Sequence, residues 1–166
     1  MLNERIINKK QLAFIIEDED GEIFGYYCNS KIENNYDRSN DFGGFSISSY
    51  NQETDNQSFQ FNLQSKNNRL EKPMKFEIID LNRGGIRLYD KSSDYLIRLG
   101  DIDLRKENCK KHSQCNQNEN SFNYHGIDNA LCGKSGYHSF DDLDGFGFGI
   151  KVEHFRPKRI FVIQMN

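Results

Sequence analysis

Two short apolar runs joined by an acidic turn form the clearest pattern in the sequence. Leu12–Ile16 and Ile23–Tyr27 are apolar, and Glu17–Gly21 between them ends in the turn-forming dipeptide Asp-Gly. Two β-rich runs separated by such a turn predict an antiparallel hairpin. The first run has no polar alternation, so we expect an inner strand with both faces covered. Gly25 in the second run marks a place where another backbone or a ring comes close.

An inner strand needs a neighbour on each side. Only the polar residues 1–10, which read as a lead-in to the first strand, precede the hairpin. The second neighbour of Leu12–Ile16 is therefore expected to be either a later strand or a segment upstream of this chain.

Further short strands follow along the chain. Phe59–Leu63 alternates, which predicts a half-buried strand with its two rings and its leucine on one face. Ile160–Met165 carries apolar side chains on both faces, so we expect another internal strand. Similar short runs occur at 76–79, 86–89, 95–100 and 102–104.

Polar tracts separate these runs. Residues 29–58, 105–121 and 139–154 are rich in Asn, Asp, Ser, Gly or charged side chains and are predicted to be mostly loop. Asp128–Leu131 is compatible with one helical turn. No window of eleven or more residues has a sustained helical period. The sequence therefore predicts a mainly β (α+β) fold, an antiparallel β-sandwich with at most short helices.

Composition fits one domain with a core rich in aromatic rings. The chain has 166 residues, enough to bury a sizeable core. Only 36% of them are hydrophobic, but 13 Phe and 8 Tyr supply a large buried area from few positions.

Charge and hydropathy argue against two classes of protein. The net charge is −3, and no basic stripe typical of nucleic-acid binding is present. The densest basic patches, Arg105–Lys106 with Lys110–Lys111 and Arg156 with Lys158–Arg159, are interpreted as solvated loops. The longest apolar run has five residues, and the N-terminus lacks the pattern of a secretory signal. We therefore expect a cytoplasmic protein that does not span a membrane and keeps its cysteines reduced.

Sulfur and imidazole ligands are concentrated late in the chain. Cys109, His112 and Cys115, with Cys132 or His125 further on, supply four ligands of the kind that zinc prefers. Their Cys-x2-His-x2-Cys spacing is not a common zinc-binding spacing, so a loop with incidental thiols is the default interpretation. A metal- or thiol-dependent enzyme built on Cys109, His112, Cys115 and Cys132 is the alternative.

Three other motifs lack the context that their chemistry needs. Gly133-Lys134-Ser135 has Asp128 where a phosphate-binding loop has its first glycine. Glu17–Gly21 and Asp141–Gly145 are acidic enough for calcium but are not flanked by helices, so solvated turns are the better interpretation.

Five groups of motifs, taken in order, resemble the TLDc domain. They are Ile23–Tyr27; Phe59–Leu63; Gly84–Tyr89 with Leu99–Ile102; Cys115–Asn116 with Phe122–Gly126 and Leu131–Gly133; and the closing strand Phe155–Ile163. The resemblance covers residues 9–166 of a single domain spanning 1–166, with insertions expected at 34–58 and 136–152. Because that family begins with a further helix and strand before the hairpin, the chain is expected to be a truncated or divergent member.

The resemblance implies a two-sheet sandwich with short flanking helices and a binding function. Members of that family are linked to oxidation resistance, and several bind the V-type ATPase and affect its assembly. They are regarded as binding modules without an agreed active site. We therefore assign no catalytic, cofactor-binding or metal-binding residue, and we expect subunits of a V-type ATPase as partners.

Overall fold

Nearly all of the regular structure is β-strand. The computed structural model describes residues 2–33, 46–49, 57–66, 70–81, 84–89, 93–118, 120–127, 130–132 and 151–166. Five strands form one sheet: β1 (Leu12–Asp18), β2 (Ile23–Cys28), β4 (Phe59–Gln64), β5 (Met74–Glu77) and β11 (Pro157–Gln164). Six form the other: β3 (Ser46–Ser49), β6 (Ile86–Tyr89), β7 (Tyr95–Leu99), β8 (Ile102–Arg105), β9 (Ser113–Gln117) and β10 (Lys151–Phe155).

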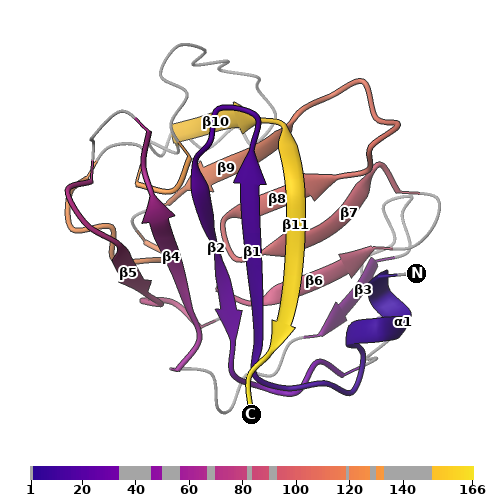
Figure 1. Cartoon of the computed structure of the whole chain (residues 1–166). Coiled ribbons are helices and arrows are strands. Elements are labelled where there is room, and N and C mark those ends of the chain that lie inside the picture. Colours follow the sequence, from indigo (N-terminus) through magenta and orange to yellow (C-terminus); the bar gives the residue numbers. More distant parts are fainter. Residues whose placement is uncertain are drawn as a thin grey trace.

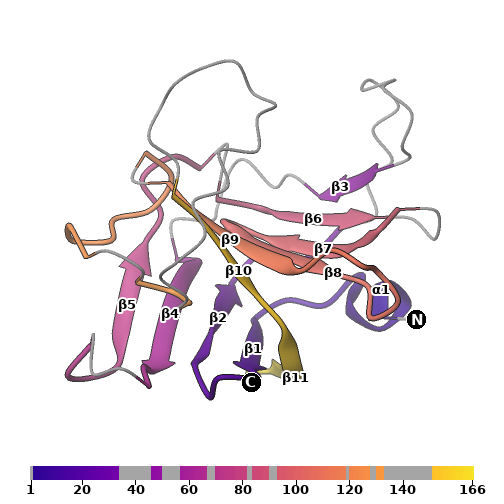
Figure 2. The ribbon, with the colours of Figure 1, turned by 90° about the horizontal axis from the view of Figure 1, so that it is seen from above.

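The two sheets are antiparallel and pack face to face. The five-stranded sheet has the order β11-β1-β2-β4-β5, and the six-stranded sheet has the order β10-β9-β8-β7-β6-β3. Figure 1 looks onto the five-stranded sheet, and Figure 2 shows the two layers from above. The predicted mainly β, two-sheet antiparallel sandwich is confirmed.

One short helix accompanies the sandwich in the described residues. This is α1 (Leu2–Ile6), which lies at one side of the molecule in Figure 1 and was expected only as a polar lead-in. Its Ile6 is buried in the core. No helix in the described part of the chain is long and apolar enough to cross a membrane.

The predicted hairpin forms as expected. β1 and β2 pair antiparallel, with Ile15 opposite Gly25. In the turn, the Asp18 carboxylate accepts the backbone N–H groups of Asp20 and Glu22 at 2.8 and 2.9 Å, and Gly21 takes a φ of 85°. The acidic side chain therefore stabilises the turn through backbone hydrogen bonds.

β1 is the predicted inner strand, and its second neighbour is a later strand. β11 pairs with β1 along its whole length, from Leu12 opposite Gln164 to Asp18 opposite Pro157. The prediction of two covered faces is only partly correct. The side of β1 that carries Phe14 and Ile16 is fully buried, whereas the opposite side is partly exposed.

Gly25 is the point of close approach that the sequence predicts. A Cβ added there would lie 1.9 Å from the backbone oxygen of Phe14 and 2.8 Å from Cζ of Phe61. The Phe61 ring thus occupies the space that any larger residue at position 25 would need.

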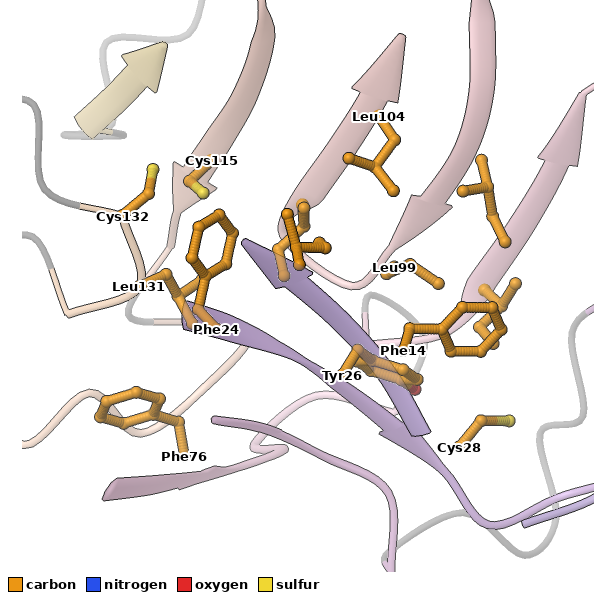
Figure 3. Packing of buried hydrophobic residues seen from close by; sticks show 14 of the residues in the cluster. Phe14, Phe24, Tyr26, Cys28, Phe76, Leu99, Leu104, Cys115, Leu131 and Cys132 are labelled. Carbon is orange, nitrogen blue, oxygen red and sulfur yellow. The ribbon is translucent and has the colours of Figure 1, made fainter. Parts of the chain in front are cut away.

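The core lies between the sheets and is rich in rings (Figure 3). The largest fully buried side chains include Phe14, Phe24 and Tyr26. Phe24 of one sheet meets Phe155 of the other edge to face, with ring centroids 5.0 Å apart. Tyr26 also donates its hydroxyl hydrogen to the carbonyl oxygen of Gly84 at 2.7 Å. Aromatic area compensates for the modest hydrophobic content, as the composition predicts.

The prediction that the last strand is internal is wrong. β11 is the first strand of its sheet and pairs with β1 alone among the described residues. Ile160 and Val162 pack against the core, but Phe161 and Ile163 on the other face are 47% and 46% exposed. Apolar side chains on both faces therefore do not mark an inner strand here.

Three segments predicted to be loop contain strands. β9 lies within 105–121, all of β10 except its last residue lies within 139–154, and β3 forms part of the polar tract 29–58. In β9 the buried side chains are Ser113, Cys115 and Gln117, so polar residues hide the alternation. The rest of the expected insertions, 34–45, 50–56 and 136–150, falls outside the described residues, as do residues 128–129 of the predicted turn at Asp128–Leu131.

We predict that Gly25→Ala lowers the free energy of unfolding by more than about 2 kcal/mol, because the new methyl group overlaps backbone and the Phe61 ring. Gly85→Ala is the matched control, since no atom lies within 4 Å of an added Cβ there, and it should change stability by about 0.5 kcal/mol or less. Equilibrium urea unfolding measures both. Equal stabilities of the two variants would contradict the packing described for Gly25.

Candidate functional site

Strand β4 turns its amides inward and its rings outward. Gln60 and Asn62 are buried, at 0% and 1% exposure, and they face the core beside Tyr26 and Phe24 of β2. Gln60 Nε2 donates to the carbonyl oxygen of Leu99 at 3.2 Å, and Asn62 Nδ2 donates to that of Leu131 at 2.7 Å. The predicted alternation is correct, but the apolar set lies on the opposite face from the sandwich core.

This orientation creates an apolar outer face on the five-stranded sheet. The sheet register places the following side chains on it: Ala13 and Ile15 of β1, Ile23 and Tyr27 of β2, Phe59, Phe61 and Leu63 of β4, and Phe161 and Ile163 of β11. We call this set the outer face. Leu63 is 44% exposed, and Met165, just beyond β11, is 50% exposed. No described helix or strand lies over these residues in Figures 1 and 2.

An aromatic cluster occupies the part of the outer face that belongs to β2 and β4. The rings of Tyr27 and Phe59 are 5.1 Å apart, and those of Phe59 and Phe61 are 6.2 Å apart. Lys75 of β5 places its ammonium group 4.6 Å from the centre of the Phe59 ring. On the β11 side, Glu17 accepts hydrogen bonds from Lys158 at 3.1 Å and from Arg159 Nε at 2.7 Å. An apolar centre between charged borders is the usual composition of a protein-binding surface.

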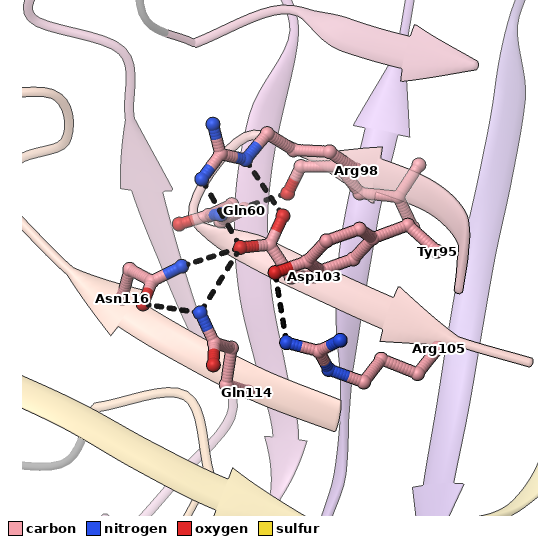
Figure 4. A network of polar contacts seen from close by, with 8 residues as sticks. Gln60, Tyr95, Arg98, Asp103, Arg105, Gln114 and Asn116 are labelled. Carbon is pink, nitrogen blue, oxygen red and sulfur yellow. Dashed lines mark hydrogen bonds and ion pairs between the residues drawn. The ribbon is translucent and has the colours of Figure 1, made fainter. Parts of the chain in front are cut away.

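The six-stranded sheet has a different outer surface. Figure 4 shows its polar network, in which Asp103 of β8 is the shared acceptor. Arg98 donates to both of its carboxylate oxygens at 2.7 and 3.0 Å, and Asn116 donates at 2.7 Å. Although burial opposes it, the Asp103 carboxylate raises the pKa of the Arg98 guanidinium, which stays charged. These side chains satisfy one another, so the two sheets present chemically distinct surfaces.

A second polar cluster is buried between the sheets. The Tyr124 hydroxyl lies 2.5 Å from Gln60 Oε1 and 2.7 Å from Asp101 Oδ2. A hydroxyl has one proton and can donate to only one of these oxygens. Both contacts are satisfied when Asp101 is protonated and donates to Tyr124. Consistent with this, burial raises the pKa of Asp101 to about 7, although the ionised carboxylate would accept hydrogen bonds from Tyr124 and the Asn118 N–H, which oppose the rise.

The structure separates the four residues of the alternative enzyme hypothesis into two pairs. Cys115 and Cys132 are buried together, and burial followed by their mutual hydrogen bond raises the pKa of the Cys115 thiol. Cys109 and His112 instead line a surface cleft. Among the described residues, no three His, Cys, Asp or Glu side chains are grouped as metal ligands. A protonated, buried thiol is a weak nucleophile.

The structure brings the two basic patches together. Arg105–Lys106 with Lys110–Lys111 and Arg156 with Lys158–Arg159 line the same cleft, with a volume of about 660 Å³. Sequence reasoning treated each patch as a separate solvated loop. The segments are about 50 residues apart, and only the β10–β11 corner brings them together, so no local signal in the sequence could have joined them.

The sequence also missed the outer face. The feature of the sequence that could have indicated the outer face is the presence of apolar side chains on both sides of two strands, β1 and β11. Such a pattern indicates either an inner strand covered on both faces or a strand whose second apolar face is left open. β11 is the second case.

We predict that one thiol of the folded protein reacts with a thiol reagent. Cys109 is partly exposed, whereas Cys28, Cys115 and Cys132 are buried. Titration with 5,5'-dithiobis(2-nitrobenzoic acid) should count one fast thiol in native buffer and four in denaturant. Rapid reaction of Cys115 or Cys132 in the folded state would contradict the burial described and favour the thiol-enzyme alternative.

We predict that Asp101 makes stability fall as pH rises. Its pKa is about 7 in the folded protein and 3.8 without perturbation, so between these values the folded state binds a proton that the unfolded state does not. This contribution is full below about pH 4 and is lost by about pH 7. Asp101→Asn cannot titrate, so its stability relative to the wild type should rise by a few kcal/mol from pH 5 to pH 8.

Urea unfolding at both pH values measures the effect. Asp94→Asn, at an exposed position, is the matched control, and its stability relative to the wild type should be the same at both pH values. If Asp101→Asn behaved like this control, the buried carboxyl would not be protonated at neutral pH.

Comparisons with known proteins add no relative. No family model, no curated protein and no solved structure matches the chain. The function must therefore be argued from the geometry of the described residues and from the resemblance of the sequence motifs.

Proposed function

We propose that the chain is a non-catalytic, TLDc-like interaction module that binds a partner protein through the outer face of its five-stranded sheet. The observation that carries the proposal is the exposure of large apolar side chains, Leu63, Phe161, Ile163 and Met165, around an aromatic cluster. Clustered apolar surface of this kind marks interaction sites in folded proteins.

The shape of the surface favours a protein over a small molecule. The outer face belongs to four adjacent strands and is a sheet surface with charged borders at Lys75 and at Glu17. Small ligands bind in concave sites, whereas protein interfaces combine an apolar centre with a polar rim. Aromatic side chains such as Phe59 and Tyr27 supply large contact areas with few rotatable bonds.

The resemblance of the motifs supplies the identity of the partner. Several members of the TLDc family bind the V-type ATPase, so the proposal extends to its subunits, to a cytoplasmic location and to protection against oxidative stress. The motif residues Phe59, Phe61 and Phe161 lie on the outer face, which connects the resemblance with the surface.

The free edge of β11 adds a second element to the same surface. Its backbone pairs with β1 on one side, and no described strand pairs with the other side. An unpaired edge offers N–H and C=O groups to an extended segment of a partner. Phe161 and Ile163 would lie directly beside such a segment.

We predict that the double variant Phe161→Ser and Ile163→Ser weakens partner binding at least about tenfold, because each removed side chain is the size of a typical interface anchor. Both positions are exposed, so the fold should be retained. The measurement is native affinity purification from cytosol and membranes, with quantification of V-type ATPase subunits.

The double variant Ile79→Ser and Leu81→Ser is the matched control. These side chains are 59% and 41% exposed, follow β5 and are not among the side chains of the outer face. Recovery of the ATPase subunits with the wild type and the control, and their loss with the β11 variant, is the expected result. Equal recovery with all three proteins would exclude the outer face, and recovery of no ATPase subunit would remove the partner named here.

A further inference from the structure

The surface cleft described above is formed where the two sheets meet. One wall is the connection from β8 to β9, residues 105–113, and the other is the β10–β11 corner, residues 155–160. Glu19 of the β1–β2 turn completes it, and its backbone N–H donates to the carbonyl oxygen of Arg156 at 3.0 Å. The cleft thus lies beside the outer face but is lined by other residues.

Cations dominate the lining of the cleft. Seven Lys and Arg side chains line it: Arg105, Lys106, Lys110, Lys111, Arg156, Lys158 and Arg159. Glu19 and Glu107 are the carboxylates of the lining, and Glu17, just outside it, pairs with Lys158 and Arg159. Seven cations against three carboxylates leave an excess of four positive charges. Lys110, Lys111 and Arg156 form no ion pair with the described residues.

Arg105 contributes an unmatched donor to the wall. Its guanidinium stacks on the Tyr95 ring at 4.1 Å, and its terminal nitrogen donates to the Tyr95 hydroxyl at 2.8 Å (Figure 4). The Nε atom is buried and has no acceptor among the described residues. A buried donor without an acceptor is costly, and Arg105 belongs to the lining of the cleft.

We propose that this cleft binds a small ligand that carries several phosphate groups. A volume of about 660 Å³ is in the range of small-molecule sites and is on the order of 10 Å across. A polyphosphate places four negative charges within that space, since each phosphate group carries between one and two of them. An extended acidic peptide with four carboxylates on alternate residues would span about 20 Å. Such a ligand is either a soluble polyphosphate or the headgroup of a phosphorylated lipid.

The site goes beyond the proposed partner-binding function, because a different set of residues carries it. The lining also contains four apolar residues, Leu96, Phe155, Pro157 and Ile160. Lower local polarity strengthens the attraction between the cations and a phosphate.

The test uses inositol hexakisphosphate as the soluble probe. Isothermal titration calorimetry at physiological salt should give a micromolar dissociation constant for the wild-type chain. The triple variant Lys110→Gln, Lys111→Gln and Arg156→Gln should weaken binding at least about tenfold, because the three exposed cations that form no ion pair are removed.

The triple variant Lys9→Gln, Lys10→Gln and Lys72→Gln is the matched control. It removes the same charge from exposed positions outside the cleft and should bind like the wild type. Urea unfolding of both variants verifies that the fold is retained. If both variants weakened binding equally, the loss of affinity would be explained by net charge alone, and the proposal would be overturned.

Two further measurements separate the sources of the phosphate groups. Vesicles of phosphatidylcholine, with and without phosphatidylinositol bisphosphate, test the lipid headgroup, and a short poly-glutamate peptide tests an acidic protein segment. If the chain binds the soluble probe but not the lipid vesicles, the ligand is soluble. If the chain binds the phosphorylated lipid and the soluble probe displaces it from the vesicles, the ligand is a membrane headgroup. Binding of poly-glutamate alone, or of none of the three, overturns the proposal. Either result leaves the outer face as a separate question, since its residues are unchanged in these variants.

Discussion

The orientation of β4 determines what each side of the five-stranded sheet can do. Gln60 and Asn62 are held inside by hydrogen bonds to Leu99 and Leu131, and Gln60 also contacts Tyr124. Because side chains alternate along a strand, fixing two amides inside places the rings of Phe59 and Phe61 outside. A slip of one residue would bury the rings and expose the amides, at the cost of every one of these hydrogen bonds. The rings of β4 therefore lie on the outer face because its two amide side chains are held in the core.

The same arrangement explains why the molecule has two unlike surfaces. On the six-stranded sheet, polar side chains face outward around Asp103, and the inward side carries Ile97, Leu99 and Leu104. On the five-stranded sheet, part of the inward side is polar and the outward side is apolar. Gly25 supports this inversion, because its missing side chain gives the Phe61 ring a place on the sheet. The outer face thus results from the side of each strand that is turned inward. The basic cleft results from the way in which the two sheets meet.

The sequence predicts most of the fold, and the failures have physical causes. The hairpin from Leu12 to Cys28, its turn and the role of Gly25 follow from local pattern, because adjacent strands and a short turn need no distant information. The inward face of β4 and the strand β9 do not follow from local pattern, since Gln117, Gln60 and Asn62 are buried and donate hydrogen bonds to distant backbone oxygens. A polar side chain in a periodic pattern is predicted to face solvent unless its hydrogen-bond partner is known.

The candidate sites were less accessible to sequence reasoning than the strands. The outer face requires knowing that β11 closes the sheet at its edge, which depends on pairing across about 140 residues. The cleft requires the single residue Arg156 to connect β10 in one sheet with β11 in the other. The two basic patches are recognisable one at a time in the sequence, but their proximity is a property of the chain's route between the sheets.

The pairing of β1 with β11 also has a consequence for biosynthesis. β1 is made before β11, and the strand that completes its hydrogen bonds follows about 140 residues later. At about 5–20 residues per second, translation of that interval takes on the order of 10 seconds. Throughout it, Leu12–Ile16 has one backbone edge without its final neighbour, which is long enough for chaperones to bind and for nascent chains to associate. The five-stranded sheet therefore cannot be complete until β11 has been made.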